Sequence, residues 1–364
     1  MSKKMRKLKV SIIGATGYTG KEIVRILINH PQVELVYLTS STYAEKKVAE
    51  VFPEFRSKLD QELVNLDLET VSRDSDLVFT ALPHTVSMEV APALLRKGVK
   101  VIDLSADYRL KDPVVYQEWY KKGHNQLSKG LLAQAVYGLP EIYFDKIKGS
   151  SLVANPGCYP TSIILGVAPL LKYHLVKPEG IIIDAKSGTT GAGRKLSLDL
   201  HFSECNENFK AYKIIGHNHI PEIEQELSSI YFKGNKGENN IQDIKEGRGI
   251  KISFTPHLLP ISRGILSTGY LTLEELKEEG KVLEAYQKFY QKAPFVRIFE
   301  PPYLPEIKLA VGTNYCDIGF RIDKRVSQIK IISVIDNLLK GAAGQAVQNM
   351  NIMSGFPETE GLNF

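Results

Sequence analysis

The chain has 364 residues, of which 43% are hydrophobic and 24% charged, and its formal net charge is +5. This length predicts a large core divided between two domains. The small, dispersed charge excess gives no reason to expect nucleic acid as a partner, and no stretch approaches the roughly 18 apolar residues of a membrane span. The three cysteines, an odd number without close pairing, predict neither a disulfide framework nor a cysteine metal site.

The basic N-terminus resembles the start of a secretion signal, but the apolar run after it is short. Only Val10 to Ile13 precede Gly14, far fewer residues than the apolar core of a signal peptide. We therefore expect a cytoplasmic protein without a membrane segment.

A strand, a glycine loop and a helix open the chain. The β-branched run Leu8 to Ile13 leads into Gly14-Ala-Thr-Gly-Tyr-Thr-Gly20, and an amphipathic helix follows before Pro31. This order is typical of a dinucleotide-binding βαβ unit, in which glycines admit the pyrophosphate and the helix N-terminus attracts it. A plain turn is the alternative. The residues expected to contact the cofactor are Gly14, Thr16, Gly17, Tyr18, Thr19 and Gly20.

Short hydroxyl side chains follow the predicted second strand, Glu34 to Thr39. NAD-binding proteins often place an acidic residue here to hold the ribose 2′-hydroxyl, and this chain has Ser40 and Ser41 instead. With Lys46 and Lys47 nearby, the loop favours the 2′-phosphate of NADP(H). A polar loop with no cofactor role is the alternative interpretation.

Two further buried strands end in loops that can line a site, one at Pro83 and one after Asp103. Ligands of open α/β sheets sit outside the carboxyl ends of the strands. We expect Asp103 and Asp107 to cap and brace loops rather than to catalyse. Arg109 could bind an anion or pair with either carboxylate.

We expect the chemistry at Cys158, in the stretch Asn155-Pro-Gly-Cys-Tyr-Pro-Thr161. A mostly buried helix is predicted from Pro160, because proline suits the first position of a helix. Cys158 would then lie at or just before a helix N-terminus, where the dipole and the N–H groups lower the pKa of a thiol. A small buried core residue is the alternative, and position alone does not choose between the two.

Two later segments carry further candidates. A strand from Gly180 to Lys186 runs into Ser187-Gly-Thr-Thr-Gly-Ala-Gly-Arg194, a flexible glycine-rich loop that ends in a cation. His217 and His219 precede a helix that begins near Pro221, and residues two apart on an extended segment face the same way. No third ligand is indicated nearby, so we expect a pair facing the site and no metal.

The rest of the second half alternates strands with helices and predicts an α+β domain built on a sheet. A helix is predicted over Glu274 to Lys292 and more strand over Lys308 to Asp323. Lys233 to Gly249 is polar and predicts a surface excursion. The last helix, Asp336 to Met353, contains small residues and is expected to pack against the first domain.

Taken together, the motifs closely resemble the N-acetyl-gamma-glutamyl-phosphate reductase family over essentially the whole chain. The resemblance rests on the segments quoted above around Gly14, Cys158 and Ser187. It rests also on Asp103-Leu-Ser-Ala-Asp-Tyr-Arg109, Tyr137-Gly-Leu-Pro-Glu141, His217-Asn-His-Ile-Pro-Glu-Ile223, Pro260-Ile-Ser-Arg-Gly264 and Lys340-Gly-Ala-Ala-Gly-Gln-Ala346. It implies an α/β Rossmann-type NADP-binding domain (1–155 and 330–364). It also implies an α+β glyceraldehyde-3-phosphate-dehydrogenase-like catalytic and dimerisation domain (156–329).

The resemblance further implies NADP(H) as cofactor, Cys158 as nucleophile, and a homodimer or homotetramer. The additional cofactor contacts it implies are Pro83, Ser187, Gly188 and Asn314. The expected reaction is reduction of N-acetyl-gamma-glutamyl phosphate to N-acetylglutamate semialdehyde and phosphate, a step of arginine biosynthesis, through a Cys158 thioester. Either His217 or His219 would be the general acid/base. The candidates for binding the substrate's phosphate and carboxylate are Arg194, Arg109 and Arg263.

Two alternatives stay open. A related enzyme could act on the longer aminoadipyl phosphate of lysine biosynthesis, on a carrier-bound substrate, or on aspartyl phosphate. A dinucleotide-binding regulatory protein without catalysis is the alternative from another class, and the intact Cys158 and both histidines speak against it.

The chain departs from the family pattern at three positions. The family often has arginine where this chain has Ser41, glycine where it has Glu45, and arginine where it has Asn218. The first two bear on the NADP contact, because a guanidinium is the usual partner of a phosphate. The third bears on how the histidine loop is tethered.

Overall fold

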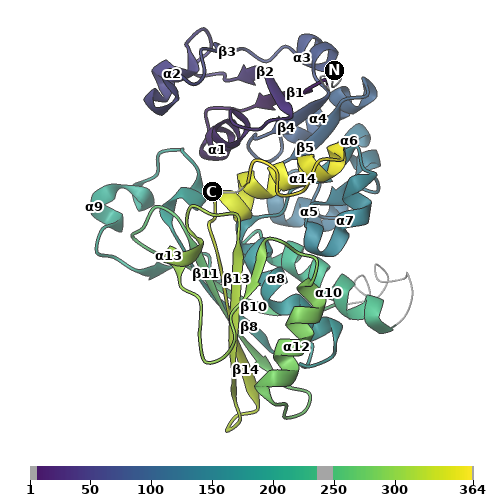
Figure 1. The fold of residues 1–364 in the computed structure, drawn as a ribbon, viewed down its shortest axis with the longest axis vertical. Coiled ribbons are helices and arrows are strands. Elements are labelled where there is room, and N and C mark those ends of the chain that lie inside the picture. The colour runs from purple at the N-terminus through teal and green to yellow at the C-terminus, as the bar shows by residue number, and fades with distance from the viewer. Residues whose placement is uncertain (1–5, 236–248, 363–364) are drawn as a thin grey trace, which may run out of the picture. The chain divides into compact units, whose positions relative to one another are not determined.

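The structure is a computed structural model that describes residues 6–235 and 249–362. The chain divides into two compact units (Figure 1): unit 1 contains Met1–Pro156 and Ala342–Asn363, and unit 2 contains Gly157–Gly341. A boundary at residue 330 would separate strand β14 (Gln328–Ile335) from its sheet neighbours β11 and β13, so the chain returns to unit 1 only at Ala342.

Unit 1 is built on a parallel sheet with strand order β3-β2-β1-β4-β5-β7-β6. Because β1 and β4 are neighbours, the strand order reverses between them, and open α/β sheets bind ligands at such a point. The Rossmann-type fold expected from the sequence is confirmed. The strands are β1 (Leu8–Ile13), β2 (Val33–Thr39), β3 (Leu63–Val64), β4 (Leu77–Thr80), β5 (Lys100–Asp103), β6 (Val136–Tyr137) and β7 (Leu152–Ala154).

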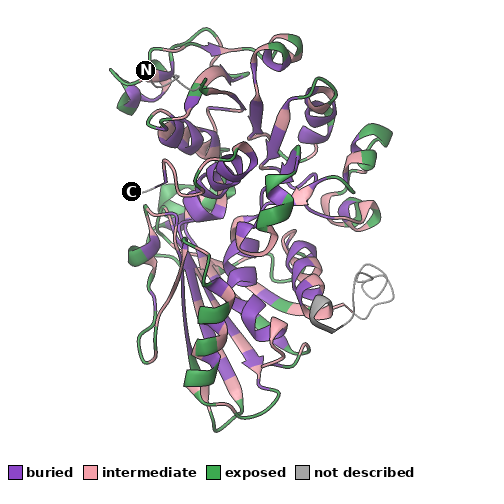
Figure 2. Ribbon diagram, turned by 45° about the vertical axis from the view of Figure 1, so that its right-hand side comes forward, coloured by how far each residue is buried: buried purple, intermediate pink, exposed green. Residues whose placement is uncertain are grey.

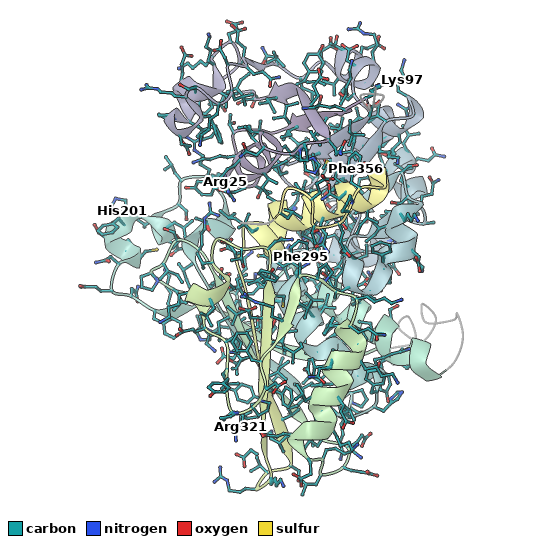
Figure 3. The ribbon with its side chains drawn as sticks, viewed as in Figure 1. Arg25, Lys97, His201, Phe295, Arg321 and Phe356 are labelled. Atoms are coloured by element: carbon teal, nitrogen blue, oxygen red, sulfur yellow. The ribbon has the colours of Figure 1, made fainter. Side chains whose placement is uncertain are left out.

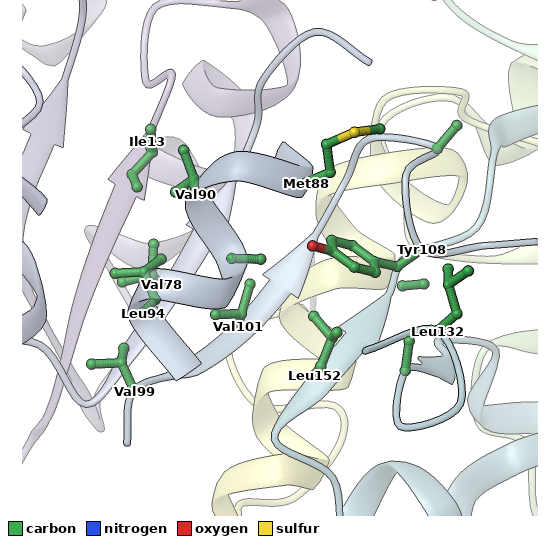
Figure 4. Packing of buried hydrophobic residues seen from close by; sticks show 14 of the residues in the cluster. Ile13, Val78, Met88, Val90, Leu94, Val99, Val101, Tyr108, Leu132 and Leu152 are labelled. Atoms are coloured by element: carbon green, nitrogen blue, oxygen red, sulfur yellow. The ribbon is translucent and has the colours of Figure 1, made fainter. Parts of the chain in front are cut away.

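Helices cover this sheet and bury its apolar strands. Val90 and Leu94 of α4 pack with Val78 of β4 and Val101 of β5 in one cluster (Figure 4). Strands buried on both faces are the reason that β4 and β5 are near-continuous apolar runs in the sequence. The helices of unit 1 are α1 (Tyr18–Leu27), α2 (Val48–Val51), α3 (Leu68–Asp74), α4 (Ser87–Arg96), α5 (Pro113–Tyr120), α6 (Gln126–Leu131), α7 (Pro140–Lys148) and α14 (Gly344–Ser354).

The final helix α14 belongs to unit 1, as expected, but it is shorter than the predicted helix from Asp336. A π-helical turn, Leu339–Ala343, precedes it. Asp336 ends the strand segment by accepting hydrogen bonds from the N–H groups of Leu338 and Leu339. Since ten residues of α14 are buried, the helix is a central support of unit 1 rather than a surface element.

Unit 2 is built on a mixed sheet with strand order β12-β13-β14-β11-β8-β10-β9. β8 pairs parallel with β10 and antiparallel with β11, so the sheet has the mixed character expected of an α+β domain. The strands are β8 (Ile181–Ser187), β9 (Lys210–Ala211), β10 (Ile252–Leu258), β11 (Ile265–Thr272), β12 (Val296–Ile298), β13 (Cys316–Asp323) and β14 (Gln328–Ile335).

One face of this sheet is covered by helices, foremost α8, which contacts β11 and β14. Tyr286 and Tyr290 of α12 tie that helix to α8 by donating their hydroxyls to the carbonyls of Gly166 (2.5 Å) and Leu165 (2.6 Å). The helices of unit 2 are α8 (Cys158–Lys172), α9 (Phe202–Cys205), α10 (Ile220–Asn235), α12 (Glu279–Tyr290) and α13 (Ile307–Ala310).

The other face of the sheet is half-exposed over much of its width (Figure 2). Buried and partly exposed residues alternate along β11, and on β8 Ile182 is 46% exposed. Since side chains alternate between the faces of a strand, the buried set faces the helices and the other set does not.

Within residues 6–235 and 249–362, no helix is long and apolar enough to cross a membrane. The cytoplasmic location stays a prediction. Most of the polar stretch 233–249 lies outside the described residues. The helix predicted over 274–292 is α12, and the strand predicted over 308–323 begins only at Cys316, after the short helix α13.

Candidate active site

The glycine loop of unit 1 has the shape of a ligand cradle. Gly14 has φ +89°, and a Cβ on it would collide with the carbonyl oxygen of Ala81; a Cβ on Gly20 would collide with the carbonyl oxygen of Gly14. The N-cap of α1 is Gly17, which has no side chain to occupy the first N–H groups. The loop therefore brings the backbone close and offers a helix N-terminus, which together suit a phosphate. Thr16, Tyr18 and Thr19 lie half-buried along this loop.

The end of β2 carries hydroxyls and no carboxylate. The hydroxyls of Thr16 and Ser40 lie 2.9 Å apart, and Ser40 also accepts the N–H of Tyr43 at 3.2 Å. Ser41 is exposed. Lys47 forms an ion pair with Asp60 at 2.7 Å, so this lysine is partly neutralised. The residues present leave room for a 2′-phosphate without like-charge repulsion.

Two acidic residues, Asp103 at the end of β5 and Asp107 in the loop after it, brace loops. Asp107 accepts the N–H groups of Thr85 (2.8 Å) and Met88 (3.0 Å) and the hydroxyl of Tyr116 (2.6 Å). These bonds fix the loop that contains the exposed Pro83 and the start of α4. Asp103 accepts the hydroxyl of Thr80 at 2.7 Å, and its burial raises the pKa of its carboxyl.

Arg109 also faces the backbone of unit 1. Its Nε donates to the carbonyl of Asn155 at 2.8 Å and one Nη to the carbonyl of Leu104 at 2.9 Å, and the residue is buried. These bonds hold the strand end that leads to the cysteine segment. The predicted contact of Arg109 with substrate stays a prediction.

Cys158 is the first residue of α8, so its expected place at a helix N-terminus is confirmed. The helix begins two residues before the predicted Pro160, because the carbonyl of Gly157 already accepts the N–H and the hydroxyl of Thr161, both at 2.9 Å. Cys158 is partly exposed and is not in a disulfide, whereas Cys205 and Cys316 are buried. A partly exposed thiol at the end of a 15-residue helix is placed for nucleophilic chemistry.

Two residues far from Cys158 in sequence pack against it or its neighbour. The N–H of Gly157 donates to Oε1 of the buried Glu222 at 2.8 Å. A Cβ on Gly341, in the π-helical turn, would come within 2.9 Å of Cys158 Cβ. Both contacts lie in unit 2, and both fix the nucleophile from elements that follow it in the chain.

The two histidines lie together on a turn rather than on the extended segment that was expected. Ile220 N–H bonds the carbonyl of His217 at 2.9 Å, and the ring centroids of His217 and His219 are 4.9 Å apart. The ring of Tyr159, the residue next to Cys158, contacts both histidine rings, with centroid distances of 5.6 Å to His217 and 6.0 Å to His219. The histidine pair is therefore joined to the cysteine helix through an aromatic side chain.

His217 is held neutral. Burial, with a smaller contribution from the charge of Lys213, lowers its pKa to about 4. The backbone N–H of His219 donates to Nδ1 of His217 at 3.1 Å. Because an acceptor nitrogen carries no proton, the neutral ring holds its hydrogen on Nε2.

The glycine-rich loop after β8 is pinned to the segment before β11. The N–H of Gly188 donates to the carbonyl oxygen of Gly264 at 2.9 Å. A Cβ on Gly188 would lie only 2.7 Å from the carbonyl oxygen of Ser262. Ser187 is buried and its hydroxyl donates to the carbonyl of Gly188 at 3.0 Å. Only glycine fits at this crossing.

The three remaining predicted site residues, Asn314, Arg263 and Arg194, all belong to unit 2 and differ in burial and contacts. Asn314 is buried, and neither polar atom of its amide has a hydrogen-bond partner among the described residues. Arg263 lies 3.6 Å from the buried carboxylate of Asp336. Arg194 is exposed at the end of the glycine-rich loop. In the described residues no group of three His, Cys, Asp or Glu could hold a metal ion.

Two residues of this site were not singled out from the sequence. Glu222 looked like an ordinary acidic residue of a helix start, and Tyr212 carried no motif. Tyr212 bonds the hydroxyl of Tyr159 at 3.0 Å, and burial raises its pKa to about 12. The position of Glu222 three residues after His219 is a signal that could have drawn attention to it.

Known proteins match the chain in both units. Residues 9–150 match the family described as semialdehyde dehydrogenase, NAD binding domain, and residues 158–337 match semialdehyde dehydrogenase, dimerisation domain. Among solved structures, aspartate semialdehyde dehydrogenase II of Vibrio cholerae has a TM-score of 0.70 at 17% identity, covering 96% of this chain and 99% of that one. The two family matches place the chain among the semialdehyde dehydrogenases, a class of oxidoreductases.

Closer relatives narrow the class. The N-acetyl-gamma-glutamyl-phosphate reductase of Pelotomaculum thermopropionicum is 51% identical over 98% of this chain and 97% of its own length. The enzyme of the same name from Desulfotalea psychrophila is 50% identical over 98% of both chains. The chain belongs to the N-acetyl-gamma-glutamyl-phosphate reductase family.

Proposed function

We propose that this chain reduces N-acetyl-gamma-glutamyl phosphate to N-acetylglutamate semialdehyde, with release of phosphate, using NADPH. The observation that carries the proposal is the partly exposed Cys158 at the first position of α8, joined through Tyr159 to two histidines. A sulfur nucleophile suits this reaction because a thioester is reducible by hydride, whereas an ordinary ester is much less so.

The residues present fit the cofactor. The Gly14–Gly20 cradle and the N-terminus of α1 would hold the pyrophosphate, and the hydroxyls at Ser40 and Ser41 would receive the 2′-phosphate. The buried amide of Asn314 offers a donor and an acceptor that no described residue uses, which suits a carboxamide. When bound, NADPH supplies the hydride.

Cys158 acts first in this mechanism. Its thiolate attacks the acyl carbon of the substrate, the phosphate leaves, and the acyl group stays on sulfur as a thioester. The N–H groups of the first turn of α8 are candidate donors to the oxyanion, each worth about 3–4 kcal/mol in such sites. Glu222 supports this turn through its bond to Gly157.

We infer that His219 is the general acid/base and His217 its fixed neighbour. His217 has Nδ1 occupied by the N–H of His219 and a pKa of about 4, so it does not take up a proton near neutral pH. His219 is the remaining imidazole able to protonate the hemiacetal oxygen and later remove that proton. Arg194 and Arg263 are the cations of unit 2 proposed to bind the phosphate and the carboxylate of the substrate.

We further propose that the chain works as a homodimer or a homotetramer. The matched family is described as a dimerisation domain, and the half-exposed face of the sheet in unit 2 is a surface that a second copy can cover. Sedimentation velocity at micromolar concentration tests this part independently of activity.

The function is tested with Cys158→Ser and its matched control Cys316→Ser, which changes a buried cysteine on β13. We expect Cys158→Ser to abolish NADP-dependent oxidation of the semialdehyde while the folded far-UV spectrum is kept. Cys316→Ser should retain most of the activity. Near-normal turnover by Cys158→Ser would refute the assignment.

Relative activity separates the remaining substrates. The wild-type protein is assayed with the N-acetylglutamyl, aminoadipyl and aspartyl phosphates, and the first should give the highest kcat/KM. A higher kcat/KM with another acyl phosphate would show that the protein is a reductase of that substrate instead. No turnover with any of them, despite binding of NADPH, would favour a regulatory protein.

A further inference from the structure

Residues Arg194–Ile215 form an arm that leaves unit 2 between two parts of the active site. It begins after the glycine-rich loop at Ser187 and ends just before His217. A glycine with positive φ bounds each end, Gly193 at +81° and Gly216 at +88°, and a Cβ on either would meet nothing within 4 Å. The arm is thus a discrete segment whose two ends adjoin site residues.

The arm has a folded structure of its own. The thiol of Cys205 donates to the carbonyl of Asp199 at 3.0 Å, and Lys210 pairs with the carboxylate of Asp199 at 2.8 Å. The short helix α9 lies at its far end, where Figure 3 shows His201 pointing away from the ribbon. Because these bonds fix the backbone of the arm, they also fix which of its side chains are exposed to solvent.

These side chains turn apolar groups outward. Leu196 is 97% exposed, Ile215 94% and Phe202 76%. Leu198, Phe209 and Ile214 are more than half exposed as well. A protein that works as a monomer rarely exposes so many large apolar groups on one segment, since their burial is favourable by about 1.5–3 kcal/mol each.

We propose that the arm docks on a second copy of this chain. Its residues fall within the region that matches a dimerisation domain. The arm is also continuous with the half-exposed face of the sheet, because β9 pairs with β10 and the ring of Phe209 stacks on His257 of β10 at 5.0 Å. A standard interface takes roughly 20–30 residues from each partner, and residues 194–215 form a segment of that size.

The charges on the arm suit a copy of itself better than a strongly charged partner. Four basic residues (Arg194, Lys195, Lys210, Lys213) flank three acidic ones (Asp199, Glu204, Glu207) along the segment. Because neither sign of charge dominates, the arm attracts a nucleic acid or an acidic membrane only weakly. In an isologous contact, where the same surface of two copies meets, basic groups of one copy can pair with acidic groups of the other.

Docking would also set the site. Arg194 is the first residue of the arm, and His217 follows its last glycine. A partner that holds the arm would therefore make contacts beside both of these residues. The dimer would add these contacts to the bonds that already fix the histidine turn and the glycine-rich loop within one subunit.

Two experiments test the arm. A photo-crosslinking residue replaces Phe202, with Val326 on the β13–β14 connection as the control, since it is 54% exposed. We expect a covalent dimer from position 202 and none from position 326. Separately, the pair Leu196→Ser and Ile215→Ser should raise the dimer dissociation constant at least about tenfold in sedimentation velocity, and Val326→Ser should leave it unchanged.

Other occupants give distinct results. Crosslinks from position 202 that leave the protein a covalent monomer would show an arm folded on its own subunit and would overturn the proposal. An unchanged dissociation constant in the double variant would do the same. Because both readouts need no substrate and are made equally with Cys158→Ser, they are independent of the proposed reaction.

Discussion

The backbone N–H of Gly157 donates a 2.8 Å hydrogen bond to the carboxylate of Glu222, which is 1% exposed. The two residues are 65 positions apart in the chain, yet the bond fixes the residue immediately before the nucleophile. The start of α10 thus determines the geometry of the start of α8.

Replacement of Glu222 should separate hydrogen bonding from charge. Glu222→Gln keeps an acceptor for Gly157 and should lower kcat modestly. Glu222→Ala leaves a buried N–H unpaired, which costs about 1–3 kcal/mol of folding free energy, and the displaced cysteine should lower kcat about 100-fold. Steady-state kinetics and urea denaturation measure both effects.

The control lies on the same helix. Glu224 pairs with Lys251 at 2.9 Å and accepts the N–H of Ile252 at 3.2 Å, without contact to Gly157. Glu224→Ala should therefore reduce stability while kcat stays near the wild-type value. Equal losses of kcat in both alanine variants would contradict a specific role for Glu222.

His217 should make stability depend on pH. Its pKa is about 4 in the folded state and near 6.5 in the unfolded chain, so between these values the unfolded state binds more protons. The contribution of His217 to the free energy of unfolding is then fully present above pH 6.5. It is lost as pH falls toward 4, by at most about 3 kcal/mol. Urea denaturation of the wild type and of His217→Gln from pH 4 to 8 measures this. A variant with the same pH slope as the wild type would exclude His217 as the source.

Gly341 should tolerate no side chain. A Cβ there would lie 2.9 Å from Cys158 Cβ, so Gly341→Ala must move the cysteine, and a shift of about 1 Å can cost about 100-fold in rate. Gly280→Ala is the control, because a Cβ at Gly280 of α12 meets nothing within 4 Å. It should keep full activity and gain up to about 1 kcal/mol. Full activity in Gly341→Ala would show that the cysteine position is not critical.

Glu45 should be replaceable by glycine with a gain in stability. Glu45 has φ +70°, a conformation that L-residues with side chains adopt at a cost of about 1–2 kcal/mol. Because glycine loses more entropy on folding, we expect a net gain of up to about 1 kcal/mol for Glu45→Gly. Thermal unfolding measures it, and Glu50→Gly within α2 should instead destabilise. A loss in Glu45→Gly would mean that the side chain of Glu45 contributes contacts that outweigh the backbone strain.

The elements that follow local rules were predictable from the sequence. The apolar run before Gly14 and the glycines after it specify β1, the loop and α1, and Pro160 marks the start of α8 within two residues. Local patterns work here because strand, turn and helix signals depend on neighbours in the chain.

Contacts between distant segments were not predictable in the same way. Nothing near Glu222 indicates Gly157 as its partner, and nothing near Gly341 indicates the cysteine against which it packs. The helix α14 is buried on all sides, with polar residues such as Asn349 bonding to Gly138 (2.9 Å) and Asn155 (3.0 Å), so its sequence lacks the one-sided pattern from which a helix face is predicted.

The same helix bears on the order in which the protein is synthesised. The strands of unit 1 precede unit 2 in the chain and α14 follows it, and Asn351 anchors α14 to His30 at 3.0 Å. Domains usually complete themselves from the N-terminus during translation. Here the strands of unit 1 lack the helix that completes their unit until the whole of unit 2 has been translated, so unit 2 can finish folding before unit 1 does.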